Sequence, residues 1–145
     1  MEKWKKDYLK GILQDYPKME DYYLERKEKL LLHNQKTHQR ANTDTKDKKL
    51  LISISLDRQL INLEWNQRII SLCLENSTEE TRKIIKLLYM TNHRKVNLDL
   101  VADQVFLSKR QVIRLRDAFF EELAEHLGIW CLFFGTKTNI RSYIV

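Results

Sequence analysis

The apolar residues of this chain recur at intervals of three and four over most of its length, which is the period of amphipathic helices. The stretch 98–128 shows this pattern most clearly, and it predicts a short helix, a tight turn and a longer helix. Asn97 stands just before the first of these helices as an expected side-chain cap. The apolar face of that helix carries Leu98, Val101, Ala102 and Val105.

The second helix of this stretch has start and stop signals of its own. Phe106-Leu107 is the predicted turn, and Ser108 with Gln111 forms a capping box, in which the hydroxyl accepts from the third backbone N–H and the amide reaches back. Gly128 is the expected C-terminal stop. Two helices joined by so short a turn must cross steeply, as in a helix-turn-helix. The predicted buried seam is Val112, Leu115, Phe119, Leu123 and Leu127.

Two charged helices are expected earlier in the chain, as an N-terminal helical hairpin over residues 1–33 that Pro17 interrupts. Its dense Glu and Lys content is typical of a solvated accessory hairpin, and the alternative is a surface for a partner protein or for oligomerisation. Residues 34–48 contain one apolar residue and are predicted to be a polar linker. The helix-turn-helix domain is then expected over residues 49–128.

The first helix of that domain is predicted over residues 49–76. Its apolar residues cover so much of its circumference that it is either central to the domain or half covered by a second subunit. Ser77 with Glu80 forms a second predicted capping box, which opens a helix over residues 78–90. A connecting loop, residues 91–96, leads into the helix-turn-helix.

The apolar tail, residues 129–145, departs from the helical period. Its β-branched and aromatic residues surround a turn with Gly and Asn, which suggests a short β-hairpin, but a buried helix has the same short apolar run. The large apolar side chains of Trp130, Phe133 and Phe134 are expected to be buried. They either close the core of the monomer or form a homodimer interface.

Composition agrees with an all-α helical bundle, because 145 residues include only three Gly and one Pro. The net charge of +6 is compatible with a polyanion as partner. The chain lacks a glycine-rich phosphate loop, a nucleophile elbow and a paired-carboxylate constellation, so we expect neither an enzyme nor a cofactor. Cys73 and Cys131 lie far apart without the Cys/His spacing of a metal site, so no metal is expected.

The sequence also shows no secretion or membrane signal. The polar N-terminal segment has no apolar region of the signal-peptide type. No apolar run approaches the length of a membrane span. We therefore expect a cytoplasmic protein without a membrane partner.

Charge along the second helix of the 98–128 stretch is the feature that points to a function. Its first turns carry Lys109, Arg110, Gln111, Arg114 and Arg116, and its last turns carry Glu121, Glu122 and Glu125. Helices are ordinarily stabilised by acidic residues at the N-terminus and basic residues at the C-terminus. The reversed order favours an external anion at the N-terminal end, and in a helix-turn-helix that end meets the major groove of double-stranded DNA. Ordinary solvated charges are the alternative.

Helical geometry predicts different roles for these side chains. Arg110 and Arg114 lie one turn apart, where both guanidinium groups can point into a major groove and match guanine O6 and N7. Ser108 and Lys109, at the helix start, are expected to meet phosphate. Gln111 either caps the helix or reads an adenine edge, since it cannot do both well.

Three further basic residues complete the predicted set. Arg94 and Lys95, in the connecting loop, are expected to hold the flanking DNA backbone. Arg116 is flanked by seam residues, so we expect it to snorkel or to pair with an acid such as Asp103 or Glu64.

Several segments in succession carry a family resemblance. A long helix contains Arg68-Ile69, a second helix closes in Ile85-Lys-Leu-Leu-Tyr89, and the helix-turn-helix contains Leu107-Ser108-Lys109-Arg110 and ends in Leu127-Gly128. This pattern resembles the RinA/ArpU family of phage transcriptional regulators, and the N-terminal DYPKMEDYYLERKEKLL is similar to the opening helices of that family. Two departures are the missing glycine-rich segment in mid-chain and the additional apolar tail.

The resemblance implies an activator of phage late genes that works in the cytoplasm of a bacterial host. It also implies a DNA-binding unit similar to the promoter-reading domain of sigma factors, and host RNA polymerase as a second partner. Two other classes of function stay open. One is a phage DNA-packaging protein of the small terminase type, in which the helix-turn-helix sits in an oligomeric ring. The other is a protein–protein module whose Lys/Arg face docks on an acidic partner.

Overall fold

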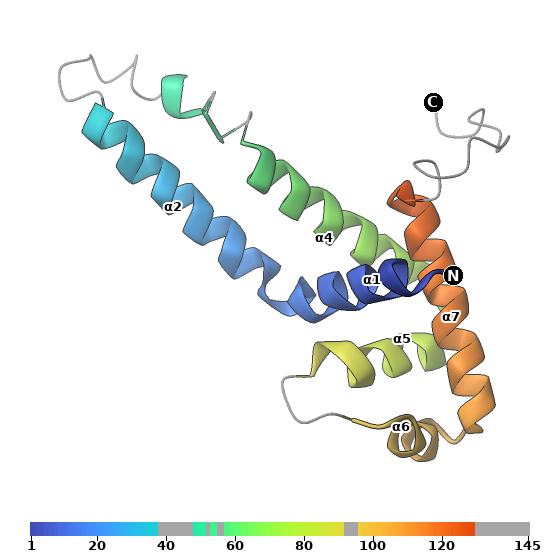
Figure 1. Ribbon diagram of the computed structural model, residues 1–145. Coiled ribbons are helices and arrows are strands. Elements are labelled where there is room, and N and C mark those ends of the chain that lie inside the picture. The colour runs from blue at the N-terminus through green and yellow to red at the C-terminus, as the bar shows by residue number, and fades with distance from the viewer. Residues whose placement is uncertain (38–47, 52, 55–56, 92–95, 130–145) are drawn as a thin grey trace, which may run out of the picture.

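The computed structural model describes residues 1–37, 48–51, 53–54, 57–91 and 96–129, and every regular element in them is helical. This confirms the all-α prediction. None of the described helices is long and apolar enough to cross a membrane. In chain order the elements are α1 (Lys3–Asp15), the 3-10 turn η1 (Tyr16–Lys18), α2 (Met19–Thr37), α4 (Arg58–Asn76), α5 (Glu79–Ile85), the π-helical turn η2 (Lys86–Met90), α6 (Leu98–Val105) and α7 (Lys109–His126) (Figure 1).

The two N-terminal helices are separated near Pro17, as predicted. α1 ends at Asp15, and Pro17 lies in the first turn of η1, where its missing N–H leaves no intrahelical bond unmade. α2 then runs to Thr37, and so extends into the first residues of the predicted linker. Apart from Lys48, the rest of that linker lies outside the described residues. The predicted tail hairpin lies outside them as well. The same holds for nearly all of the tail residues proposed as a dimer interface.

The prediction of a single helix over residues 49–76 is wrong. Residues 48–51 and 53–54 are helical, but α4 itself begins only at Arg58. Asp57 interrupts the helical path because its backbone is extended, with φ −68° and ψ 118°. Its carboxylate instead caps α4 by accepting a hydrogen bond of 3.1 Å from the backbone N–H of Leu60.

The predicted capping box at Ser77 and Glu80 is also wrong, by one residue. Thr78 is the cap of α5, and its hydroxyl oxygen accepts a hydrogen bond of 3.3 Å from the N–H of Thr81. The Ser77 hydroxyl donates to the carbonyl oxygen of Cys73 at 2.6 Å and so closes the end of α4. Neighbouring hydroxyl residues therefore serve two different helices.

The core consists of two clusters of buried side chains that share α7. The smaller cluster joins α5, α6 and the N-terminal half of α7 through Ile84, Val101, Ala102, Val105 and Val112. The larger cluster joins α1, α4, α5 and the C-terminal half of α7, and includes Leu9, Leu13, Ile69, Ile70, Cys73, Leu74, Ile85, Phe119, Phe120, Leu123 and Ala124. The adjacent residues Ile84 and Ile85 belong to one cluster each, so α5 lies between the two.

The N-terminal helices differ in how they meet this core. Leu9 and Leu13 of α1 are fully buried in the larger cluster, so α1 is not the solvated accessory helix that its charge suggested. α2 instead runs beside α4 as the second arm of a long hairpin that extends away from α7 (Figure 1). The α1 side chains thus support the helix that carries the basic residues.

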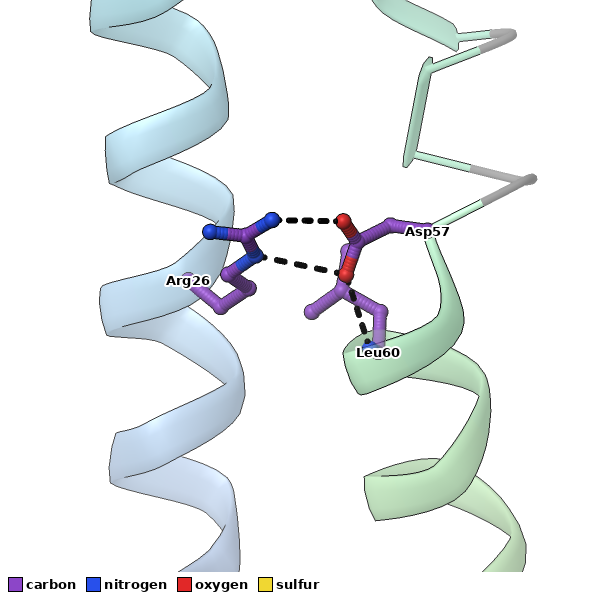
Figure 2. A network of polar contacts seen from close by, with 3 residues as sticks. All are labelled: Arg26, Asp57 and Leu60. Carbon is purple, nitrogen blue, oxygen red and sulfur yellow. Dashed lines mark hydrogen bonds and ion pairs between the residues drawn. The ribbon is translucent and has the colours of Figure 1, made fainter.

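A polar contact joins the two arms of the hairpin (Figure 2). Arg26 of α2 donates from Nη2 to Oδ2 of Asp57 at 2.8 Å and from Nε to Oδ1 at 3.3 Å. The same carboxylate caps α4 at Leu60. The hydrogen bonds from Arg26, together with the backbone N–H of Leu60, hold the pKa of Asp57 below its ordinary value, although burial acts in the opposite direction.

We expect Phe120→Ala to lower the free energy of unfolding by about 3–5 kcal/mol, because Phe120 is fully buried in the larger cluster. Phe106→Ala is the matched control, since Phe106 is 92% exposed and its loss should cost less than about 1 kcal/mol. Urea unfolding followed by circular dichroism measures both values. Equal effects of the two substitutions would contradict the assignment of the core.

We expect Asp57→Asn to reduce stability at neutral pH and to lose this effect in acid. Asparagine still caps a helix, but it cannot form the ion pair with Arg26. Because the folded pKa of Asp57 is lowered, its stabilising contribution is present above the ordinary Asp pKa of about 3.9. That contribution disappears as the pH falls through the folded value. Urea unfolding over a pH series should therefore show the difference between the two proteins shrinking below about pH 4, and a constant difference would refute the linkage.

Candidate nucleic-acid interface

α6 and α7 form a compact pair at one end of the molecule. Asn97 is the N-cap of α6, as predicted, and its side-chain oxygen accepts a hydrogen bond of 2.8 Å from the N–H of Leu100. Three residues separate α6 from α7. α6 is seen nearly end-on where α7 runs lengthwise, so the two helices cross steeply (Figure 1).

Phe106 in this turn is a feature that the sequence did not reveal. Its backbone is left-handed, with φ 58° and ψ 38°, and the residue is 92% exposed. A residue other than glycine in this conformation costs about 1–2 kcal/mol. The turn is nevertheless held by a hydrogen bond of 3.1 Å from the N–H of Leu107 to the carbonyl oxygen of Ala102.

The predicted capping box at the start of α7 is confirmed. The N–H of Gln111 donates to Oγ of Ser108 at 3.2 Å, and Oε1 of Gln111 accepts from the N–H of Ser108 at 3.1 Å. Bidentate reading of adenine would require the same Oε1 to accept from the adenine amino group. Of the two roles predicted for Gln111, the structure therefore favours the cap.

Lys109 opens α7 beside the first turn of α6. Its Nζ lies 3.4 Å from Oδ1 of Asp99, and both side chains are more than half exposed. An ion pair so exposed contributes less than about 1 kcal/mol. A phosphate group can therefore compete with Asp99 for the ammonium group at little cost.

Arg110 and Arg114 are both exposed and lie one helical turn apart on α7. Neither guanidinium group forms an ion pair with any carboxylate of the described residues. The buried side chains of α7 occupy the other side of the helix, at Val112 and then at Phe119 and Phe120. Two bidentate donors thus project from the end of α7 that is next to α6.

Arg116 lies at the boundary of the core, but it does not pair with the acids predicted for it. Its guanidinium group pairs with the adjacent Asp117 at 3.0 Å and lies 5.8 Å from the centre of the Phe120 ring. The pairing with Asp103 or Glu64 is therefore wrong, although the side chain is only 16% exposed, as expected for a structural role. Burial raises the pKa of the nearby Tyr89 hydroxyl, and Arg116 acts against this shift.

The structure thus brings five of the seven candidate residues together at one end of α7. These are Ser108, Lys109, Arg110, Gln111 and Arg114. Arg94 and Lys95 lie outside the described residues, and their contact with a DNA backbone stays a prediction.

Comparisons with known proteins identify no relative of this chain. No family model, no curated protein and no solved structure matches it.

We expect Ser108→Ala to lower the free energy of unfolding by about 0.5–2 kcal/mol, because it removes the acceptor for the N–H of Gln111. Ser108→Thr is the matched control and should retain most of the stability, since threonine also caps helices. Chemical unfolding measures both. If the alanine and threonine variants unfold alike, the capping box does not stabilise α7.

Proposed function

We propose that this chain is a transcription regulator that binds double-stranded DNA through α6 and α7 as a helix-turn-helix. In this proposal the N-terminal end of α7 enters the major groove. The observation that carries it is the exposure of Arg110 and Arg114 on one face, without a carboxylate partner among the described residues. Guanidinium groups in this arrangement suit the O6 and N7 acceptors of guanine.

The surrounding contacts support this assignment of roles. Ser108 and Lys109 lie at the helix start, where exposed N–H groups favour phosphate. Asp117, which would otherwise place negative charge beside Arg114, is neutralised by Arg116. Gln111 caps the helix and contributes order rather than base recognition.

The biological part of the proposal is an activator of phage late genes in a bacterial host, with host RNA polymerase as a partner. It rests on the resemblance to RinA/ArpU regulators in the segments around Arg68-Ile69 and in Leu107-Ser108-Lys109-Arg110. A DNA-binding unit similar to the promoter-reading domain of sigma factors is part of the same proposal.

A DNA-packaging oligomer is the second candidate function, and exposed apolar side chains of α4 favour it. Ile61, Trp65 and Leu72 are 48%, 49% and 40% exposed and recur at helical spacing along one face of this helix. Such a face can join copies of the chain into a ring. Size-exclusion chromatography with light scattering separates the candidates, since a closed ring of many subunits supports packaging and a monomer or dimer supports the regulator.

We expect Arg110→Ala and Arg114→Ala each to weaken binding to a selected duplex site by about 1–3 kcal/mol and to relax base preference at one position. Arg68→Ala is the matched control, because this exposed arginine lies on α4 and pairs with Glu64. Fluorescence anisotropy with the cognate duplex and with single-base variants measures both effects. Unchanged affinity and preference in both α7 variants would refute the assignment of the recognition helix.

A further inference from the structure

Three metal-ligating side chains meet where α4 packs against the C-terminal half of α7. They are Cys73 of α4 and Glu122 and His126 of α7, and one ligand atom from each lies within 4.8 Å of the others. Cys73 and Glu122 are far apart in sequence, so no spacing rule could reveal this group. Only the packing of the larger cluster brings them together.

The two α7 residues are already oriented towards each other. They lie one turn apart, and Nε2 of His126 is 3.8 Å from Oε1 of Glu122. Their side chains are 24% and 39% exposed, whereas Cys73 is fully buried. Cys73 therefore lies on the inner side of the group, and Glu122 and His126 border solvent.

We propose that Cys73, Glu122 and His126 form a binding site for a divalent metal ion of the Zn²⁺ type. Thiolate, imidazole and carboxylate are the ligands that Zn²⁺ takes, at bond lengths of about 2.0–2.3 Å. A tetrahedral ion with such bonds holds its ligand atoms roughly 3.3–3.8 Å apart. A nitrogen and an oxygen ligand lie at the short end of this range, at roughly 3.3–3.5 Å. The 3.8 Å between Glu122 and His126 is slightly longer, so modest side-chain rotations are needed to close this pair and to bring the sulfur into reach.

The Cys73 thiol has to lose its proton to bind the ion. Burial and the negative charge of Glu122 raise the pKa of Cys73 to about 12, so the thiol keeps its proton at neutral pH. A bound dication replaces that proton, which passes to solvent, and it also neutralises Glu122. With three protein ligands, the fourth position stays open to water on the exposed side.

Metal binding at this site would fasten α4 to the C-terminal half of α7. Glu122 is twelve residues from Arg110, which corresponds to about 18 Å along the helix. The ion would therefore contact no residue of the proposed DNA surface. Its direct effect is on the stability of the helix pair, and it is independent of the proposed function.

Cobalt(II) tests the site directly, because a thiolate bound to Co²⁺ gives a charge-transfer band in the near ultraviolet. The full-length chain is reduced, freed of metal and titrated with Co²⁺, and then with Zn²⁺ to displace the cobalt. We expect a saturable band at one ion per chain that Zn²⁺ abolishes. We also expect Zn²⁺ to raise the melting temperature of the protein.

Matched variants locate the ligands. Cys73→Ala should lose the charge-transfer band, and Cys131→Ala should keep it. Glu122→Gln and His126→Gln alter partly exposed side chains, so they test the site even if the Cys73 variant folds poorly. Each should weaken Zn²⁺ binding by more than about 100-fold. Absence of the band in the wild-type chain, its survival in the Cys73 variant, or an unchanged Zn²⁺ affinity of the His126 variant would overturn the proposal.

Discussion

The packing of α7 into both hydrophobic clusters is the interaction on which the rest of the structure depends. Val112 anchors its N-terminal half beside α6, and Phe119, Phe120 and Leu123 anchor its C-terminal half against α1 and α4. Each large side chain so buried contributes about 1.5–3 kcal/mol. Because both halves of α7 are packed against other helices, the position of its basic N-terminal end is fixed relative to the core.

Burial of one side of α7 also determines how its charges are divided. Arg116 lies at the edge of the buried side, where it packs over Phe120 and is satisfied by Asp117. Arg110 and Arg114 lie on the open side without such partners among the described residues. One helix thus carries arginines of two kinds, and the exposed kind is the one suited to an external anion.

Sequence reasoning succeeded where the determinants are local. The bounds of α6 and α7 follow from Asn97, from the capping box at Ser108 and from the left-handed Gly128, all of which act within a few residues. It failed where the local pattern did not show that a helix is interrupted, as in the helix predicted over residues 49–76. The apolar period runs on past Asp57, yet Asp57 is extended, and its carboxylate caps α4 and meets Arg26 of a distant helix.

The remaining features depend on contacts between residues distant in sequence. Nothing in the charged sequence of α1 shows that Leu9 and Leu13 lie in the main core. The grouping of Cys73, Glu122 and His126 likewise exists only after α4 has packed against α7. For the candidate DNA surface, by contrast, helical periodicity sufficed, because Arg110 and Arg114 are neighbours on a single helix.

Selection of bound sequences from a pool of random duplexes tests the central claim most directly, since it requires no knowledge of the operator. A helix that reads the major groove with Arg110 and Arg114 should enrich a short site with guanine at fixed positions. Binding at low salt without any enriched sequence would reduce α7 to a phosphate contact. Failure to retain any duplex, even at low salt, would contradict DNA binding by this chain.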